Sequence, residues 1–98
     1  PPPPIEGTDW IQPITSFQDL CREADEMGNC VAEYAVFVIL GRSYIYRLLR
    51  PERATVELAR TAIGSWRRVQ VRGPRNSRVA PSTLSVLDRW VEGRSILD

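Results

Sequence analysis

The chain has 98 residues, 43% of them hydrophobic and 26% charged, which is the composition of one soluble domain with a modest core. It has no His and only two Cys, Cys21 and Cys30, so a zinc centre is excluded and neither a metal nor a cofactor is expected. No signal peptide or membrane span is visible, and we expect a cytoplasmic protein with reduced thiols and no membrane partner.

The formal net charge of +1 hides an uneven distribution along the chain. Residues 1–40 contain one Arg and seven acidic residues, a net charge of −6, whereas residues 41–98 contain twelve Arg and five acidic residues, a net charge of +7. All the cations are Arg. Either a GC-rich coding sequence explains this bias, or the protein recognises phosphate or carboxylate groups, which Arg binds in a planar, bidentate way.

The chain begins with four prolines, and residues 1–14 show no regular pattern. We expect this segment to be a lead-in, with Trp10 and Ile11 docked on the domain. It lacks the flanking basic residue that proline-motif ligands favour. The domain itself is expected over residues 15–93, with residues 94–98 as a tail.

A first helix is predicted between Ser16 and Gly28. Ser16 suits the N-cap, Asp19 resembles the third position of a capping box, and Gly28 suits the helix end. The apolar residues recur with helical spacing in one stripe: Phe17, Leu20, Cys21, Ala24 and Met27. The acidic residues lie off this stripe, so they are expected in solvent or against a basic partner.

The most apolar stretch is Cys30–Leu40, in which ten of eleven residues are apolar or aromatic. Asn29 and Gly41 bracket it with the residue types that start and end helices. As a helix it would span about 16 Å, too short for a bilayer. The stretch is therefore predicted to be a buried helix around which the rest of the domain is organised.

After this stretch the apolar period changes from 3.6 to 2, which predicts strands over residues 44–49, 54–59 and 66–72. The short connections between them favour an antiparallel meander. In the third strand, simple alternation places Val69 and Val71 on one face. The other face would then carry Trp66, Arg68, Gln70 and Arg72.

A last helix is predicted from Pro81 to Gly93, with Leu84, Leu87, Trp90 and Val91 in its buried stripe. The expected class is therefore α+β. It consists of two N-terminal helices, the second one buried, a three-stranded antiparallel β-meander and a C-terminal helix.

The strongest candidate for binding is the stretch from Trp66 to Arg78, which has five Arg in thirteen residues. Arg neutralises phosphate, Trp stacks on a base, and Gln or Asn reads a base edge, so this composition is typical of a nucleic-acid surface. The residues expected to bind are Arg67, Arg68, Gln70, Arg72, Arg75, Asn76 and Arg78. The alternative is a solvated edge strand whose Arg residues prevent aggregation and pair with the acidic helices, with Trp66 in the core.

Cys30 and Tyr34 lie one helical turn apart on the predicted buried helix. A nucleophilic Cys needs a base, and the sequence has no His, so Cys30 is expected to be a buried structural residue. Tyr34 is expected to be a core aromatic whose hydroxyl forms a hydrogen bond with a backbone or Arg group.

A weaker candidate for a hard-metal or acid–base site is the acidic set Asp19, Glu23, Glu26 and Glu33.

Three short motifs follow one another along the chain: Cys30-Val31-x-x-Tyr34, Thr55-x-Glu57-Leu58 and Gln70-x-x-Gly73-x-x-Asn76. In order and spacing the chain resembles the PcfJ-like family from about Trp10 to Trp90. That family often has His before the Cys, where this chain has Asn29, which argues further against Cys–His catalysis. The resemblance implies a setting on conjugative plasmids, phages and other mobile elements. It marks Cys30, Tyr34, Gln70, Gly73 and Asn76 as positions of interest and implies no reaction.

The sequence therefore predicts a non-enzymatic binding module of a mobile-element or phage-related protein, which holds nucleic acid through its third strand and exit loop. One alternative is a domain for protein interaction, oligomerisation or effector docking, in which the acidic helices and basic sheet meet other molecules. A remote alternative is a hydrolase that uses Cys30.

Overall fold

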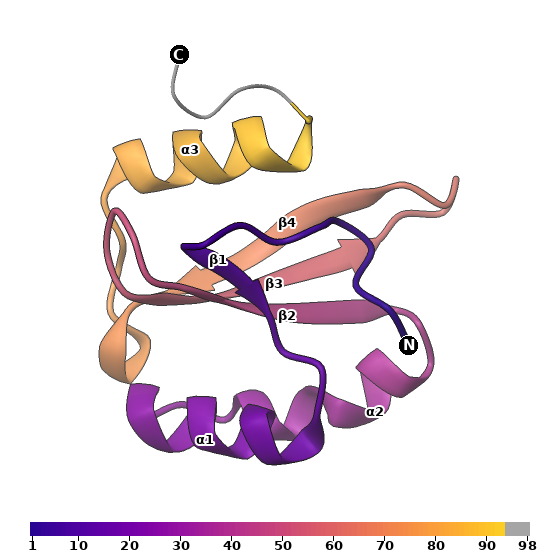
Figure 1. Cartoon of the computed structure of the whole chain (residues 1–98), viewed down its shortest axis with the longest axis horizontal. Coiled ribbons are helices and arrows are strands. Elements are labelled where there is room, and N and C mark those ends of the chain that lie inside the picture. The colour runs from indigo at the N-terminus through magenta and orange to yellow at the C-terminus, as the bar shows by residue number, and fades with distance from the viewer. Residues whose placement is uncertain (94–98) are drawn as a thin grey trace.

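The computed structural model describes residues 1–93 and consists of three layers (Figure 1). The central layer is a four-stranded antiparallel sheet whose strands lie in chain order. These strands are β1 (Ile11–Pro13), β2 (Ser43–Leu48), β3 (Ala54–Arg60) and β4 (Trp66–Arg72). The helices are α1 (Phe17–Met27), the 3-10 helix η1 (Val31–Tyr34), α2 (Ala35–Ile39), the 3-10 helix η2 (Pro74–Asn76) and α3 (Pro81–Val91).

Helices α1, η1 and α2 cover one face of the sheet, and α3 covers the other (Figure 1). The predicted α+β class, the meander β2–β3–β4 and the C-terminal helix are confirmed. Helix α1 also begins and ends as predicted: the Ser16 side chain accepts the Asp19 N–H at 3.1 Å, and Gly28 adopts the left-handed conformation. The prediction for residues 94–98 lies outside the described part of the chain.

The main core lies between the sheet and α3. Side chains alternate along a strand, so every second residue of β2 and β3 points to this face. The buried residues are Ile11, Tyr44, Tyr46, Leu48, Ala54, Val56, Leu58, Val71, Leu87 and Trp90. Tyr46 and Trp90 meet edge to face with ring centroids 4.7 Å apart, which ties α3 to the centre of the sheet.

The apolar core on the other face is smaller, with only Ile14, Leu20, Val31 and Ile45 buried in it. Most of the remaining β2–β4 residues on this face are polar or charged. Arg47 pairs with Thr55, Thr55 with Arg72, and Glu57 with Gln70. The layer between the sheet and α1–η1 is therefore partly polar.

The predicted buried helix over Cys30–Leu40 is wrong. The stretch forms η1 and the short α2, and no residue of α2 is buried. Ile39 is 73% exposed, and Leu40, the residue after α2, is 59% exposed. The reason is that β2 and β3 supply the centre of the domain. A helix on the surface of a sheet covers only its inward side, here Val31 and Val38, and leaves the rest in solvent.

The segment predicted as an irregular lead-in contains β1, so the sheet has four strands instead of three. Ile11 pairs with Leu48, and its side chain is fully buried, which confirms the predicted docking of Ile11. The buried Tyr46 hydroxyl donates to the Ile5 carbonyl at 2.6 Å and accepts the Ile5 N–H at 3.0 Å. Strand β1 has only three residues and ends in a proline, so it is too short to show an apolar period of two. It is defined only by its pairing with β2.

The register of β4 also differs from simple alternation. Leu58 pairs with Arg68 and Glu57 with Gln70, so Val69 is an extra residue at a β-bulge. Because of the bulge, the side chains of Trp66 and Arg68 point to the opposite face of the sheet from those of Gln70 and Arg72. Trp66 therefore packs on the α3 side with Val71, instead of sharing a face with Gln70.

Burial of Tyr46 gives a testable pH dependence. Burial raises its pKa from 10.0 to about 12, so its contribution to stability is complete below pH 10 and is lost as the pH rises towards 12. We expect this residue to lower the free energy of unfolding by roughly 1 kcal/mol per pH unit in that range. Urea unfolding at pH 9 and pH 11 should show a smaller pH effect for Tyr46→Phe than for the wild type. Equal pH effects in the two proteins would contradict the assignment.

Candidate functional site

A polar pocket of about 280 Å³ opens between the η1 side of the sheet, the segment before η1 and the η2 loop. It is lined by Asn29, Cys30, Val31, Tyr34, Ile45, Thr55, Glu57, Gln70, Arg72 and Asn76. Its floor is buried and consists of Val31, Ile45 and Thr55. Its rim is exposed and carries Cys30, Gln70, Arg72 and Asn76. Segments far apart in the chain therefore meet around one cavity.

The β4 bulge determines which side chains reach this pocket. Because Val69 is inserted, Gln70 and Arg72 face the same side as their partners Glu57 and Thr55. The same bulge turns Arg68 to the opposite face, where its Nε and Nη2 donate to the two Asp88 oxygens at 2.7 and 3.0 Å. These hydrogen bonds raise the pKa of Arg68. Arg68 is therefore bound to α3 and is not part of the pocket.

Two backbone hydrogen bonds close the exit loop that follows β4. The Gly73 N–H donates to the Ser77 carbonyl at 2.8 Å, and the Ser77 N–H donates to the Pro74 carbonyl at 3.1 Å. Between them Arg75 and Asn76 have positive φ angles of 54° and 62°, a conformation that costs energy for residues with a Cβ. This strained turn places Asn76 on the pocket rim.

The exit loop returns closely at Gly73. A Cβ at this position would lie 2.5 Å from the Ser77 hydroxyl oxygen, which is the end of an exposed side chain and can rotate away. We expect Gly73→Ala to lower the free energy of unfolding by about 0.5–1 kcal/mol, the lower end of the range for point substitutions. Adding Ser77→Ala should restore most of this loss, since the next nearest atom would be 3.5 Å away. Chemical denaturation of the single and double variants tests this, and equal losses in both would contradict it.

The opposite wall is held by Asn29. Its Oδ1 accepts the Val31 N–H at 3.0 Å, and its Nδ2 donates to the Thr55 hydroxyl oxygen at 3.2 Å. Asn29 thus fixes the start of η1 against β3, but the N-cap position of η1 is Cys30, one residue later than the sequence predicts. The Thr55 hydroxyl in turn donates to Glu23 Oε2 at 2.6 Å.

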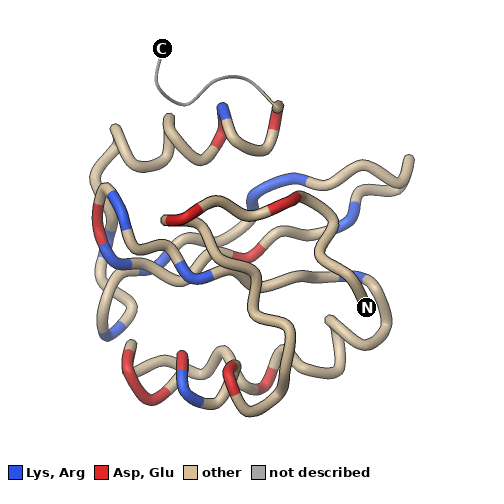
Figure 2. The backbone as a smooth tube through the Cα atoms, viewed as in Figure 1, with Lys and Arg blue, Asp and Glu red and all other residues tan. Residues whose placement is uncertain are grey.

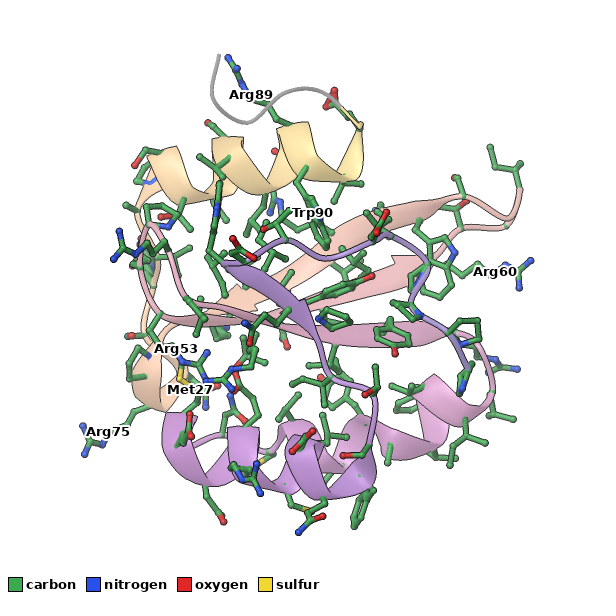
Figure 3. All side chains as sticks on the ribbon, viewed as in Figure 1. Met27, Arg53, Arg60, Arg75, Arg89 and Trp90 are labelled. Carbon is green, nitrogen blue, oxygen red and sulfur yellow. The ribbon has the colours of Figure 1, made fainter. Side chains whose placement is uncertain are left out.

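Glu23 is the centre of a buried ionic network. Its carboxylate is 2% exposed and is held by both terminal nitrogens of Arg53, one of them at 3.0 Å. Arg53 also contacts Glu26 and donates to the carbonyls of Leu48 and Ala54. These acidic partners raise the pKa of Arg53 despite its burial. Figure 3 shows Arg53 reaching towards α1, the helix that carries Glu23 and Glu26.

The charges of the acidic first part and the basic second part of the chain therefore neutralise each other in part within the fold. Figure 2 shows acidic residues along α1 and Arg residues on the strands that face it. Arg53 pairs with Glu23 and Glu26, Arg47 lies 3.8 Å from Glu26, and Arg22 pairs with Asp19 within the helix. The expectation that the acidic face of this helix is solvated is wrong for Glu23.

The weak metal candidate receives no support. Three members of the acidic set are held by Arg partners. Among residues 1–93, no group of three or more acidic or Cys residues has the geometry to hold a metal ion.

The predicted Arg surface is divided between the two ends of the sheet. Figure 3 shows Arg60 and Arg75 extending into solvent at opposite ends. Arg67 pairs with Ala59 near Arg60, so it belongs to the end away from the pocket. Arg72 lines the pocket and Arg75 lies in the exit loop, while Arg78 is exposed just beyond it.

Cys30 and Tyr34 differ from their predicted core roles. Cys30 is an exposed free thiol on the rim of the pocket, so the prediction of a buried structural Cys is wrong. Tyr34 is half-buried, lines the pocket and packs edge to face on Phe37 with centroids 6.0 Å apart. Both residues therefore contribute to the cavity.

The sequence does not assign three polar residues of the pocket to the site: Asn29, Thr55 and Glu57. A signal was present, since Thr55 and Glu57 are polar residues two apart in a strand that otherwise reads as core. Polar residues at every second position indicate that one sheet face is not apolar.

The longest helices in the described part of the chain, α1 and α3, have 11 residues each, and none meets the length and hydropathy that a bilayer crossing requires.

Comparison with known proteins gives one match, to the family model described as PcfJ-like protein, over residues 5–86. No curated protein and no solved structure matches the chain. The matched range includes every residue of the polar pocket. The chain belongs to the PcfJ-like protein family.

Proposed function

We propose that this domain is a binding module, not an enzyme, and that it holds single-stranded nucleic acid at the polar pocket and the adjoining exit loop. The observation that carries the proposal is the meeting of Tyr34, Gln70, Arg72 and Asn76 around one open cavity. These residues provide a ring for stacking, two amides for base edges and a cation for phosphate. The proposal replaces the predicted Arg-rich strand face with a site of fewer residues.

The charges around the pocket support this proposal. Within residues 1–93, neither Arg72 nor Arg75 makes an ion pair, in contrast to Arg53 and Arg68. Exposed guanidinium groups without a carboxylate partner neutralise phosphate at little cost, because no ion pair has to be broken. The Arg72 guanidinium makes a single long hydrogen bond, from Nη1 to the Val71 carbonyl at 3.4 Å. We place this activity in the cytoplasm, in a protein of a mobile genetic element, where both Cys21 and Cys30 remain free thiols.

The test is fluorescence anisotropy of a labelled oligonucleotide, single-stranded or duplex, titrated with the domain at two salt concentrations. We expect binding of single strands that weakens as salt rises, because phosphate contacts release counterions. Duplex of the same sequence should bind less well, because its bases are not available to the pocket. Absence of binding at low salt would reject the proposal.

A second candidate is self-association through the exposed apolar surface of α2. This surface consists of Val36, Phe37 and Ile39 of α2 and the following Leu40, all exposed. The exposed Phe17 of α1 adjoins it, because Phe17 and Ile39 line one pocket. They contain no charge, so the surface is complementary to the same surface of a second copy. Light scattering without nucleic acid tests this: a dimer that Ile39→Ser converts to a monomer supports it, and a monomer at high concentration rejects it.

A further inference from the structure

The size of the polar pocket limits what part of a nucleic acid it can hold. Its volume of about 280 Å³ lies at the lower end of the range for ligand pockets. One six-membered ring fits such a space, whereas a run of stacked nucleotides does not. The rim residues are exposed, so a polymer can pass across the opening while one of its bases enters.

The polar groups inside the pocket form an ordered set. Glu57 and Gln70 lie directly opposite each other on β3 and β4, which brings their Cβ atoms to about 5 Å. Arg72 is the next residue of β4 on the same face. An ionised carboxylate only accepts hydrogen bonds, an amide does both and a guanidinium only donates. The pocket thus presents an acceptor, a mixed group and a donor at neighbouring positions of the sheet.

The Glu57 carboxylate is fixed and has one oxygen available. Its Oε2 accepts the hydroxyl of the buried Ser43 at 2.9 Å. In the described residues, Oε1 makes no hydrogen bond to the protein. One free acceptor oxygen suits one exocyclic amino group on a base.

We propose, on the basis of the function proposed above, that the pocket accepts a single unstacked cytosine of a single-stranded nucleic acid. The cytosine N4 amino group would donate to Glu57, and its N3 acceptor would receive a hydrogen bond from Gln70. Arg72 would donate one N–H to the O2 acceptor, and its remaining N–H groups would still face the phosphate of the same strand. Thymine and uracil present the O4 acceptor where cytosine has N4, so they place an acceptor against the carboxylate. Tyr34 supplies the wall on which the ring stacks.

The experiment uses oligothymidylates of about ten nucleotides whose central residue is dC, dT, dA or dG, measured by anisotropy with the whole chain. We expect the dC oligomer to bind about tenfold more tightly than the all-dT oligomer, the discrimination typical of one well-formed base contact. Glu57→Gln should lower the affinity for the dC oligomer about tenfold, to that of the all-dT oligomer, because Gln keeps the shape and still accepts from Ser43 but no longer offers a carboxylate to N4. Glu33→Gln is the matched control, since Glu33 is exposed on η1 outside the pocket, and should keep the preference.

Equal binding of all four oligomers, or a preference for dG or dA, would overturn the cytosine assignment while leaving nucleic-acid binding intact. A dC preference that survives Glu57→Gln would overturn the role of Glu57. No binding of any oligomer would reject the proposed function itself. The base preference of the wild type decides the matter even if Glu57→Gln does not fold.

Discussion

Replacing Arg53 by Met is expected to lower the free energy of unfolding by about 3 kcal/mol, the lower end of the range for breaking a buried ion pair. The variant leaves the Glu23 carboxylate, which is 2% exposed, without its cation. It also removes the hydrogen bonds to the Leu48 and Ala54 carbonyls. We choose the lower end because the Arg53 side chain is 25% exposed and retains some solvent screening.

The double variant Glu23→Gln with Arg53→Met should be less damaging than the single Arg53→Met, because no unpaired charge then remains inside. Arg22→Met is the matched control. Arg22 pairs with Asp19 on the same helix, but both side chains are more than half exposed, so the loss should stay below about 1 kcal/mol. Urea unfolding of the three variants measures these differences. A similar loss for Arg22→Met and Arg53→Met would contradict the assigned role of the buried network.

Reversing two charges beside the pocket, Arg72→Glu with Arg75→Glu, is expected to weaken binding of single-stranded oligonucleotides by at least about tenfold at low salt. Both side chains are exposed, so the fold should be retained. The slope of log affinity against log salt should fall by about 1.4, because each phosphate contact on a single strand contributes about 0.7.

The matched control reverses two exposed charges at the other end of the sheet, Arg60→Glu with Arg67→Glu. It changes the net charge by the same amount, so a general electrostatic effect would weaken binding equally in both variants. We expect the control to keep most of the affinity and of the salt slope. Equal losses in the two variants would assign binding to overall charge instead of to the pocket.

The sequence predicts those parts of the fold in which local pattern and tertiary structure agree. Helix α1 has a capping Ser16 and a terminating Gly28, and strands β2 to β4 have a period of two, so the positions of these elements follow from short-range rules. Strand β1 could not be found this way, because its three residues become a strand only through pairing with β2.

Two errors about burial have physical causes beyond local pattern. An apolar run such as Cys30–Leu40 predicts burial only if nothing else supplies the core, and here β2 and β3 do. Conversely, Glu23 appears as a surface residue in any hydropathy pattern, and only its pairing with Arg53, 30 positions later, allows it inside. Long-range ion pairs leave no local signal in one sequence.

The candidate site was predicted in part. Gln70, Arg72 and Asn76 were expected to act together, and they lie around one pocket with Cys30 and Tyr34. Arg68 was assigned to the wrong face, since a one-residue bulge exchanges the two faces of a strand. No feature of the sequence marks Val69 as the inserted residue, so the composition of the site depends on the structure.

The most direct test of the pocket as the binding site is chemical-shift mapping of the isotope-labelled domain during titration with a cytosine-containing single strand. The pocket account predicts that the largest amide shifts occur at Asn29–Tyr34, at Glu57 and at residues 70–76. Shifts concentrated at Arg42, Arg60 and Arg67, at the far end of the sheet, or along the exposed face of α2 would contradict it.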